Sequence, residues 1–264
     1  MLWWLSEKKY NIMSQNSTNC LETKKFFVKK TLRFFFKKYW VWFSNPFDIK
    51  GASAVNFFSY DDLEISGFIK KKAITSIIDL TKSEDELWQG IRKKYSRKPI
   101  EDGYKAGVVV KQDEEFGEFE RIYKSFRKQK NIIADDLSIF SQGMLFSAYY
   151  KNKMIAGHIF VGDGKYMRSL VAASNRFDFE KGKDRRMVGA ANRILFWEAI
   201  KHAKERGYES FDLGGITSPN ESGEYDSLAE FKMSFGGELR PCFYYFKLYS
   251  RLIKWFMKMR GFNV

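Results

Sequence analysis

The residues best suited to chemistry include Lys232. It lies between two phenylalanines in the segment Phe231-Lys232-Met-Ser-Phe235, which directly precedes two glycines. Phe231 and Phe235 are four residues apart, so on a helix they share one face, pack inward and direct Lys232 toward a neighbouring cleft. An ammonium group there can stabilise the oxyanion that forms when an amine attacks a carbonyl group. A surface lysine on a short helix explains the same spacing, and the spacing alone favours that simpler interpretation.

Two further segments place polar side chains at the ends of predicted strands. Asp212 precedes Gly214 and Gly215 at the carboxyl end of a short strand, where open α/β sheets bind ligands. Asp212 can orient a substrate amine or accept a hydrogen bond from a loop, and capping of nearby backbone amides is an equally good interpretation. Asn175 and Arg176 follow another strand. Arg176 can hold a phosphate or carboxylate with two hydrogen bonds, although a solvent-exposed loop explains this pair at least as well.

The segment Arg186-Met-Val-Gly189-Ala-Ala191 has the spacing of a phosphate-binding loop at the start of a helix. Backbone N–H groups and the helix dipole favour anions at such a point, and Gly189 lets the backbone approach them closely. The loop would suit the pyrophosphate of coenzyme A or the phosphopantetheine of a carrier protein. The alternative is an ordinary helix N-terminus with solvated arginines, because so short a pattern often occurs by chance.

Histidine and cysteine are scarce, and this scarcity excludes several classes of site. His158 lies in an alternating strand and His202 on an apolar helix, so both are interpreted as core residues. Without a Ser-His-Asp or Cys-His arrangement, we expect direct attack by an acceptor amine and no covalent acyl-enzyme. Cys20 and Cys242 cannot form a disulfide framework, which indicates a reducing compartment. No metal site is predicted, because no Cys-x-x-Cys pair or His-rich cluster occurs.

The elements that must position these residues follow from periodicity and turn signals. From residue 107 onward, the predicted order is strand, helix, three strands, helix, strand, helix, strand, which indicates a mixed α/β sheet. Earlier in the chain, short strands are expected at 55–60, 63–69 and 73–79, and Pro99 is expected to break the helix that follows. The stretch from Lys24 to Trp40 is basic and aromatic, and predicts an amphipathic helix that lies at a membrane interface or packs on the core.

The charge balance predicts an anionic partner. Lys and Arg number 46 against 32 Asp and Glu, a net charge of +14, which fits a membrane surface, a nucleic acid or a phosphorylated substrate. A second basic amphipathic helix is predicted at the C-terminus, with Lys247, Arg251, Lys254 and Lys258 in one stripe. No apolar run approaches the length of about 20 residues that a membrane-spanning helix needs. The first ten residues lack the pattern of a signal peptide.

Four segments of the sequence are similar, in the same order, to those of the GNAT acyltransferases. They resemble in particular the Fem-type branch, which includes the aminoacyltransferases that build peptidoglycan cross-bridges. The segments span Arg97–Val108, Ala173–Ile200, Gly207–Ile216 and Leu228–Glu238. The resemblance covers roughly residues 79–245. This sequence differs from some members of the branch in two respects. Members with two GNAT-like modules have a complete first module, and some members that use tRNA carry a long charged helical hairpin; neither feature is visible here.

The resemblance implies a GNAT acyltransferase fold with an N-terminal amphipathic helical arm. The implied organisation is an arm at 1–50, a short β extension at 51–80, a core at 81–250 and a C-terminal helix at 249–264. Two catalytic residues are implied, Lys232 and Asp212. The implied substrate-binding residues are Asn175, Arg176, Gly214, Gly215 and Phe231, and those for the donor phosphates are Arg186, Gly189 and Ala191.

The expected reaction moves an acyl, acetyl or aminoacyl group onto an amine of a cell-envelope glycan or peptidoglycan precursor. No tightly bound cofactor is expected, and the donor is a coenzyme A thioester, an acyl carrier protein or an aminoacyl-tRNA. The protein is expected in the cytoplasm, bound peripherally to the anionic inner face of the membrane, with tRNA as an alternative partner and no DNA. The alternatives are a coenzyme A-dependent N-acetyltransferase of amino sugars, and a catalytically inactive GNAT fold that binds membrane or RNA.

Overall fold

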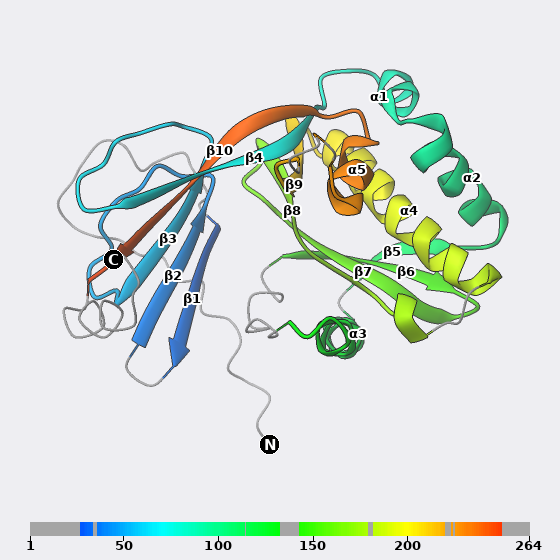
Figure 1. Ribbon diagram of the computed structural model, residues 1–264, viewed down its shortest axis with the longest axis horizontal. Coiled ribbons are helices and arrows are strands. Elements are labelled where there is room, and N and C mark those ends of the chain that lie inside the picture. Colours follow the sequence, from blue (N-terminus) through cyan, green and yellow to red (C-terminus); the bar gives the residue numbers. More distant parts are fainter. Residues whose placement is uncertain are drawn as a thin grey trace.

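The computed structural model describes residues 27–33, 36–113, 115–132, 143–178, 182–219, 223 and 225–249. These residues form one ten-stranded sheet with helices on both faces (Figure 1). The strands are β1 (Phe27–Arg33), β2 (Phe36–Trp42), β3 (Ala54–Ser59), β4 (Ile69–Asp79), β5 (Val109–Asp113), β6 (Met144–Tyr150), β7 (Lys153–Gly162), β8 (Tyr166–Ser174), β9 (Ser210–Ile216) and β10 (Glu238–Leu248). The helices are α1 (Glu84–Gly90), α2 (Lys98–Lys105), α3 (Phe116–Gln129), α4 (Lys183–Glu205) and α5 (Ser227–Met233), with a π-helical turn η1 (Lys93–Arg97) and a 3-10 turn η3 (Arg176–Asp178).

The strands lie in the order β1-β2-β3-β10-β4-β9-β8-β7-β6-β5. The last strand in the chain, β10, lies between β3 and β4 and pairs antiparallel with both. It therefore joins the N-terminal strands to the rest of the sheet. In Figure 1, β4 and β10 run from one half of the sheet to the other. The expected β extension at 51–80 thus contributes β3 and β4 to the same sheet as the core.

Different helices cover the two faces of the sheet around β7. Helix α4 packs against β6 and β7 on one face, and α3 packs against β7 and β8 on the other (Figure 1). The first face holds the largest core, to which α4 contributes Ile194, Leu195 and Phe196. Phe119 of α3 is fully buried in the core on the second face. Burial of each such side chain stabilises the fold by about 1.5–3 kcal/mol, so the strands that carry the candidate site are held from both sides.

Strands β8 and β9 run parallel, but they pair over only a short length. Their backbone partners are Tyr166 with Ser210, Met167 with Phe211 and Arg168 with Asp212. Beyond these partners, β8 continues to Ser174 beside β7, and β9 continues to Ile216 beside β4. We call the two diverging segments, Ser169–Ser174 and Leu213–Ile216, the β8–β9 fork. The fork lies at the carboxyl ends of parallel strands, which is where α/β sheets commonly bind ligands.

The N-terminal amphipathic helix expected from Lys24 to Trp40 is wrong for the residues described there. β1 pairs antiparallel with β2, and β2 pairs parallel with β3. On β2, Tyr39 and Val41 are buried in a cluster with residues of β3 and β10, and Trp42 is buried in a separate cluster. Aromatic and β-branched side chains lose rotamer freedom in helices and fit a pleated surface better. The β3 edge supplies the backbone partners, which the local sequence does not reveal.

Three smaller expectations can be compared with the structure. No strand spans 63–69, since β4 begins at Ile69. The prediction that Pro99 breaks a helix is wrong: it lies in the first turn of α2, where its missing N–H costs nothing, and η1 leads directly into α2. The interruption falls earlier, at Ile91 and Arg92, whose backbone is extended. The expected C-terminal helix at 249–264 lies outside the described residues from position 250 onward. Within the described ranges, no helix has both the length and the apolar character to cross a bilayer.

Candidate functional site

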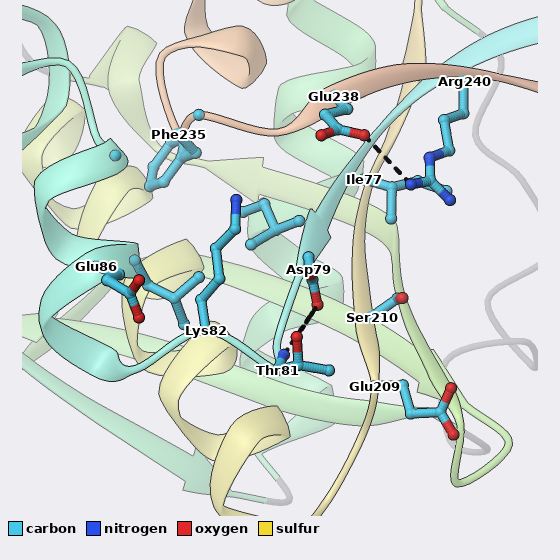
Figure 2. A pocket seen from close by; sticks show the side chains of 14 residues that line it. Ile77, Asp79, Thr81, Lys82, Glu86, Glu209, Ser210, Phe235, Glu238 and Arg240 are labelled. Atoms are coloured by element: carbon cyan, nitrogen blue, oxygen red, sulfur yellow. Dashed lines mark hydrogen bonds and ion pairs between the residues drawn. The ribbon is translucent and has the colours of Figure 1, made fainter.

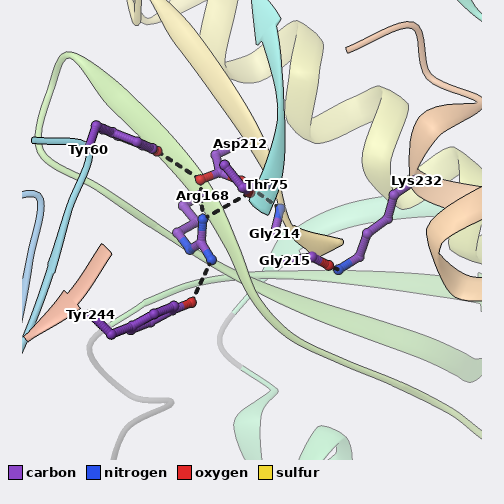
Figure 3. Close-up of polar contacts among 8 residues, drawn as sticks. All are labelled: Tyr60, Thr75, Arg168, Asp212, Gly214, Gly215, Lys232 and Tyr244. Carbon is purple, nitrogen blue, oxygen red and sulfur yellow. Dashed lines mark hydrogen bonds and ion pairs between the residues drawn. The ribbon is translucent and has the colours of Figure 1, made fainter. Parts of the chain in front are cut away.

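Lys232 projects from α5 toward the β8–β9 fork. Asp226 caps the helix by accepting hydrogen bonds from the backbone N–H groups of the residues two and three positions later, at 2.9 and 2.7 Å. Phe231 and Phe235 pack against Phe196 of α4, with ring centroids 5.5 and 5.3 Å away. This packing fixes the rotation of α5. Lys232 Nζ then donates a 2.7 Å hydrogen bond to the carbonyl oxygen of Gly215 in β9 (Figure 3).

The ammonium group of Lys232 is close to its titration range at neutral pH. Burial lowers the pKa of Lys232 to about 8, and the positive charge of Arg168 contributes to this decrease. Asp212 and Asp226 oppose the decrease. Lys232 is therefore mostly protonated at pH 7 and loses its charge just above pH 8. A positive charge that is poorly solvated is well suited to stabilise a developing oxyanion.

A buried ion pair occupies the point where β8 and β9 separate. Arg168 and Asp212, whose side chains are only 4% and 1% exposed, form an ion pair between facing residues of the two strands. Asp212 also accepts hydrogen bonds from Thr75 on β4 and from the hydroxyl of Tyr60, the latter at 2.8 Å. Arg168 donates to the hydroxyl of Tyr244 on β10 at 3.0 Å (Figure 3). Each charged group thus has several partners, as a buried charge requires.

These partners make Asp212 a structural anchor of the fork. Asp212 Oδ1 accepts a 2.7 Å hydrogen bond from the backbone N–H of Gly214. Gly214 has a φ of +88°, a conformation that favours glycine. A Cβ atom at this position would lie 3.2 Å from Lys232 Nζ. Asp212 therefore fixes the glycine turn, and the next carbonyl in the chain, that of Gly215, holds Lys232.

Asn175 and Arg176 lie at the far end of β8. The backbone N–H of Asn175 donates to the carbonyl oxygen of Ile155 at 3.1 Å. Arg176 is exposed on η3. Burial first, and then the charge of Arg176, lower the pKa of Arg193 on α4. Arg193 in turn lies over the ring of Phe231, 5.1 Å from its centroid. The two guanidinium groups are therefore close enough for their charges to interact.

The predicted phosphate-binding segment lies inside α4 rather than ahead of it. The helix begins at Lys183, and the N–H of Arg186 already donates to the carbonyl oxygen of Gly182. Arg186 is exposed, whereas Ala191 is fully buried and faces the core. The carbonyl oxygen of Gly189 accepts a 2.8 Å hydrogen bond from Arg193. The backbone N–H groups left free at this helix start are therefore those of the first turn, before Arg186.

Arg168, Ser169 and the tyrosines around Asp212 and Arg168 were not among the site residues predicted from the sequence. One feature of the sequence pointed to Arg168: it is a charged residue in the apolar strand β8, and such a residue must either face solvent or pair with another polar group. The partners themselves come from β4, β10 and the loop after β3, far apart in the chain. These partners meet at β8 and β9 because of the order of strands in the sheet, which cannot be read from a single sequence.

A cavity of about 240 Å³ lies at the opposite end of β9, and its residues are shown in Figure 2. It is polar, but its carboxylates have local partners. Asp79 accepts hydrogen bonds from Thr81 at 2.7 and 3.0 Å, and Glu238 pairs with Arg240 at 3.2 Å. Glu86 belongs to the capping box of α1. These contacts stabilise the chain turns there, so we place the candidate site at the fork. In the described part of the chain, no cluster of three or more potential metal ligands occurs.

Comparisons with known proteins support the fold. No protein-family model and no curated protein matches this sequence. FemX is similar in structure, with 13% sequence identity, a TM-score of 0.60, and coverage of 88% of this chain and 86% of FemX. The C-terminal domain of an Agrobacterium fabrum protein, named as a lysylphosphatidylglycerol synthetase, has 14% identity and a TM-score of 0.53, with 90% and 86% covered. L-PGS from Bacillus licheniformis has 12% identity and a TM-score of 0.50, with 90% and 88% covered.

These likenesses confirm the fold that the sequence resemblance implies. The chain has a mixed α/β sheet of the GNAT type, and the similar structures include FemX, as expected for the Fem-type branch. At identities of 11–14%, the likenesses establish the fold and leave the activity to the geometry of the site.

Proposed function

We propose that this protein transfers an acyl or aminoacyl group from an activated donor to a primary amine of a cell-envelope molecule. The observation that carries the proposal is the position of Lys232 Nζ, which lies at the β8–β9 fork, bonded to Gly215 and flanked by Gly214. A cation with a pKa of about 8 at this point suits carbonyl chemistry at neutral pH.

The reaction follows from ordinary acyl transfer. The neutral amine attacks the carbonyl carbon of a thioester or ester, a C–N bond forms, and the carbonyl oxygen becomes an oxyanion. Lys232 stabilises that oxyanion through its ammonium group. When the intermediate collapses, the C–S or C–O bond breaks, and the proton lost by the amine ends on the thiol or hydroxyl that leaves. The protein is unchanged by the reaction.

The choice of a cell-envelope acceptor rests on the Fem-type resemblance and on the names of similar structures. One of them is named as a lysylphosphatidylglycerol synthetase, and lysylphosphatidylglycerol is an aminoacylated membrane lipid. Positive side chains near the site favour an anionic substrate, since Arg193 lies over the ring of Phe231 and the charge of Arg176 acts on Arg193. A phosphate-bearing precursor or donor fits this charge. The proposed donor is a coenzyme A thioester, an acyl carrier protein or an aminoacyl-tRNA.

The test replaces Lys232 and measures transfer from each donor class to amine acceptors. Lys232→Ala should lower kcat/KM by about 10²–10³-fold, the effect of removing one oxyanion donor. Lys232→Arg keeps the charge and should retain part of the rate, whereas a lysine acting as a general base would not tolerate arginine.

The matched control is Lys204→Ala. Lys204 also donates its ammonium hydrogen bond to a backbone carbonyl, that of Leu80 at 3.0 Å, but it does so at the far end of α4. This variant should keep normal transfer. If Lys232→Ala is as active as the control, the proposed role of Lys232 is wrong. If the wild-type protein transfers nothing from any donor class, the alternative of an inactive binding module gains support.

A further inference from the structure

A serine begins the β8 side of the fork. Ser169 directly follows Arg168, the last residue of β8 that pairs with β9. On its other side, β8 has an irregular register with β7, because Ser169 faces Phe160 and Val171 faces Ile159, leaving Leu170 without a partner. Bulges of this kind redirect side chains and occur often beside active sites. Ser169 is half-buried.

The hydroxyl of Ser169 contacts a buried histidine. His158 Nε2 lies 2.8 Å from Ser169 Oγ. The imidazole ring stacks on Phe160, with centroids 4.2 Å apart, and meets the edge of Phe196 at 4.5 Å. His158 is only 2% exposed, so the ring is fixed by packing. Burial, and to a lesser extent Lys232, lower the pKa of His158 to about 3, which keeps the ring neutral at physiological pH.

Ser169 and Lys232 approach the same glycine. The position that a Cβ atom on Gly214 would occupy lies 3.6 Å from Ser169 Oγ and 3.2 Å from Lys232 Nζ. A hydroxyl and an ammonium group therefore border the same small space, from β8 and from α5. One reacting centre placed there can contact both groups, as an amine and the carbonyl group that it attacks must do.

We propose that Ser169 is a further catalytic residue, whose hydroxyl accepts a hydrogen bond from the attacking amine, and that His158 is the positioning residue that orients this hydroxyl. The inference rests on the proposed acyl transfer. A neutral imidazole can accept, at Nε2, a hydrogen bond that the Ser169 hydroxyl donates. With its proton directed toward His158, the oxygen of Ser169 can accept a hydrogen bond from an N–H of the amine. The lone pair of the amine nitrogen then points at the carbonyl carbon held beside Lys232.

An acyl-serine intermediate does not follow from this pair. A serine nucleophile requires a base that takes its proton, and a histidine with a pKa near 3 is too weak for that step. The amine therefore remains the nucleophile, and Ser169 aligns it without forming or breaking a bond.

The test measures kcat/KM for the acceptor amine in Ser169 variants of the full chain. Ser169→Ala should lower it about 10-fold to 100-fold, the range expected for a hydrogen bond made in the transition state. Ser169→Thr keeps the hydroxyl and should recover most of the activity. The control is Ser210→Ala, since Ser210 lies in the same pair of strands at the opposite end of β9. Equal activity of Ser169→Ala and Ser210→Ala would overturn the inference.

Two further measurements separate positioning from general structural support. His158→Phe keeps an aromatic ring between Phe160 and Phe196 and removes the hydrogen-bond acceptor. If His158 acts through Ser169, the double variant with Ser169→Ala should be no slower than Ser169→Ala alone. Additive losses would contradict that role.

The chain has two histidines, so imidazole nitrogen NMR signals can be assigned readily. His158 Nε2 should be unprotonated at neutral pH in the wild-type protein, and its signal should shift in Ser169→Ala. A protonated Nε2 would overturn the orientation proposed here, even if His158→Phe does not fold. Absence of transfer by the wild type would overturn the proposed function and this inference together, whereas an active wild type with an equally active Ser169→Ala would overturn this inference alone.

Discussion

Lys232 gains its chemical character from contacts that its helix and the fork provide. On a solvated helix it would be an ordinary cation with the usual lysine pKa of 10.5, and burial at the fork lowers that pKa to about 8. The group is still protonated at pH 7, so it can stabilise negative charge. The backbone carbonyl of Gly215 holds it in place without neutralising it.

This pKa predicts how transfer depends on pH. Below pH 8 Lys232 carries its charge, and above pH 8 it loses the charge, so stabilisation of the oxyanion falls as pH rises. With an acceptor amine that is already neutral at pH 7, transfer should decline above about pH 8. In Lys232→Arg the decline should disappear from this range, because a guanidinium stays protonated. A wild-type rate that is level up to pH 10 would contradict the role of Lys232.

The Arg168–Asp212 pair predicts a loss of stability when one partner is removed. Asp212→Asn leaves the buried guanidinium without its counter-charge, which should lower the free energy of unfolding by about 3–5 kcal/mol. The control is Asp184→Asn, which breaks an exposed pair with Lys151 and should cost about 0–1 kcal/mol. Denaturant unfolding of both variants provides the measurement. A fully stable Asp212→Asn would show that the pair does not anchor the fork.

At the residue level, sequence patterns identified groups that are close together in the structure. Lys232, Asp212, Gly214 and Gly215 were all singled out, and the structure joins them in one chain of hydrogen bonds. The pairing of Ser169 with His158 was not predicted, because His158 on its own is best interpreted as a core residue. The two residues are eleven positions apart on consecutive strands, and the register shift between these strands is not evident from the sequence.

At the level of elements, the fork depends on a turn that only glycine adopts without strain. Gly214→Ala would introduce a Cβ atom 3.2 Å from Lys232 Nζ in a backbone with positive φ. Gly164→Ala is the matched control, since its φ is +95° and nothing lies within 4 Å of the added atom. Both should lose about 1–2 kcal/mol of stability from backbone strain. Transfer should fall well beyond tenfold in Gly214→Ala alone, and equal rates in the two variants would contradict the coupling of this turn to Lys232.

The elements also show what local patterns leave undetermined. Strands β5 to β10 and helices α3 to α5 follow one another in the predicted order, because turn signals and periodicity agree there. The stretch from Lys24 to Trp40 was predicted as helix, since basic and apolar side chains separate on a helical wheel. Separation on a wheel does not exclude a strand, and here Val41 is buried by tertiary pairing with β3. The β10 position between β3 and β4 also requires contacts between the two ends of the chain.

At the scale of the whole molecule, the dominant feature is the net charge of +14. Single surface cations have little effect on stability, and the exposed ion pairs of this chain are of that kind. A charge surplus of this size affects association with anionic partners instead. The proposed acceptor belongs to the cell envelope, so we propose an anionic membrane surface as this partner.

We therefore predict that the protein binds anionic liposomes, and that the C-terminal basic stripe contributes to binding. Each Lys or Arg near an anionic surface contributes about 1 kcal/mol, which salt screens. Apolar burial of neighbouring aromatic residues is not screened. Pelleting with anionic liposomes should thus fall as salt rises without vanishing, and neutral liposomes should bind weakly. The variant Arg251→Gln/Lys254→Gln/Lys258→Gln should bind more weakly than the wild type.

The control for that variant removes three cations elsewhere, Lys98, Lys151 and Lys165, each of which pairs with an acidic residue in the structure. Both triple variants lose the same net charge, so a difference between them reports the position of the charge rather than its amount. If both bind equally, general electrostatics suffices and the stripe has no special role. If the wild-type protein stays in the supernatant with anionic liposomes even at low salt, but is retained by RNA, the positive charge serves a nucleic acid and the membrane proposal is wrong.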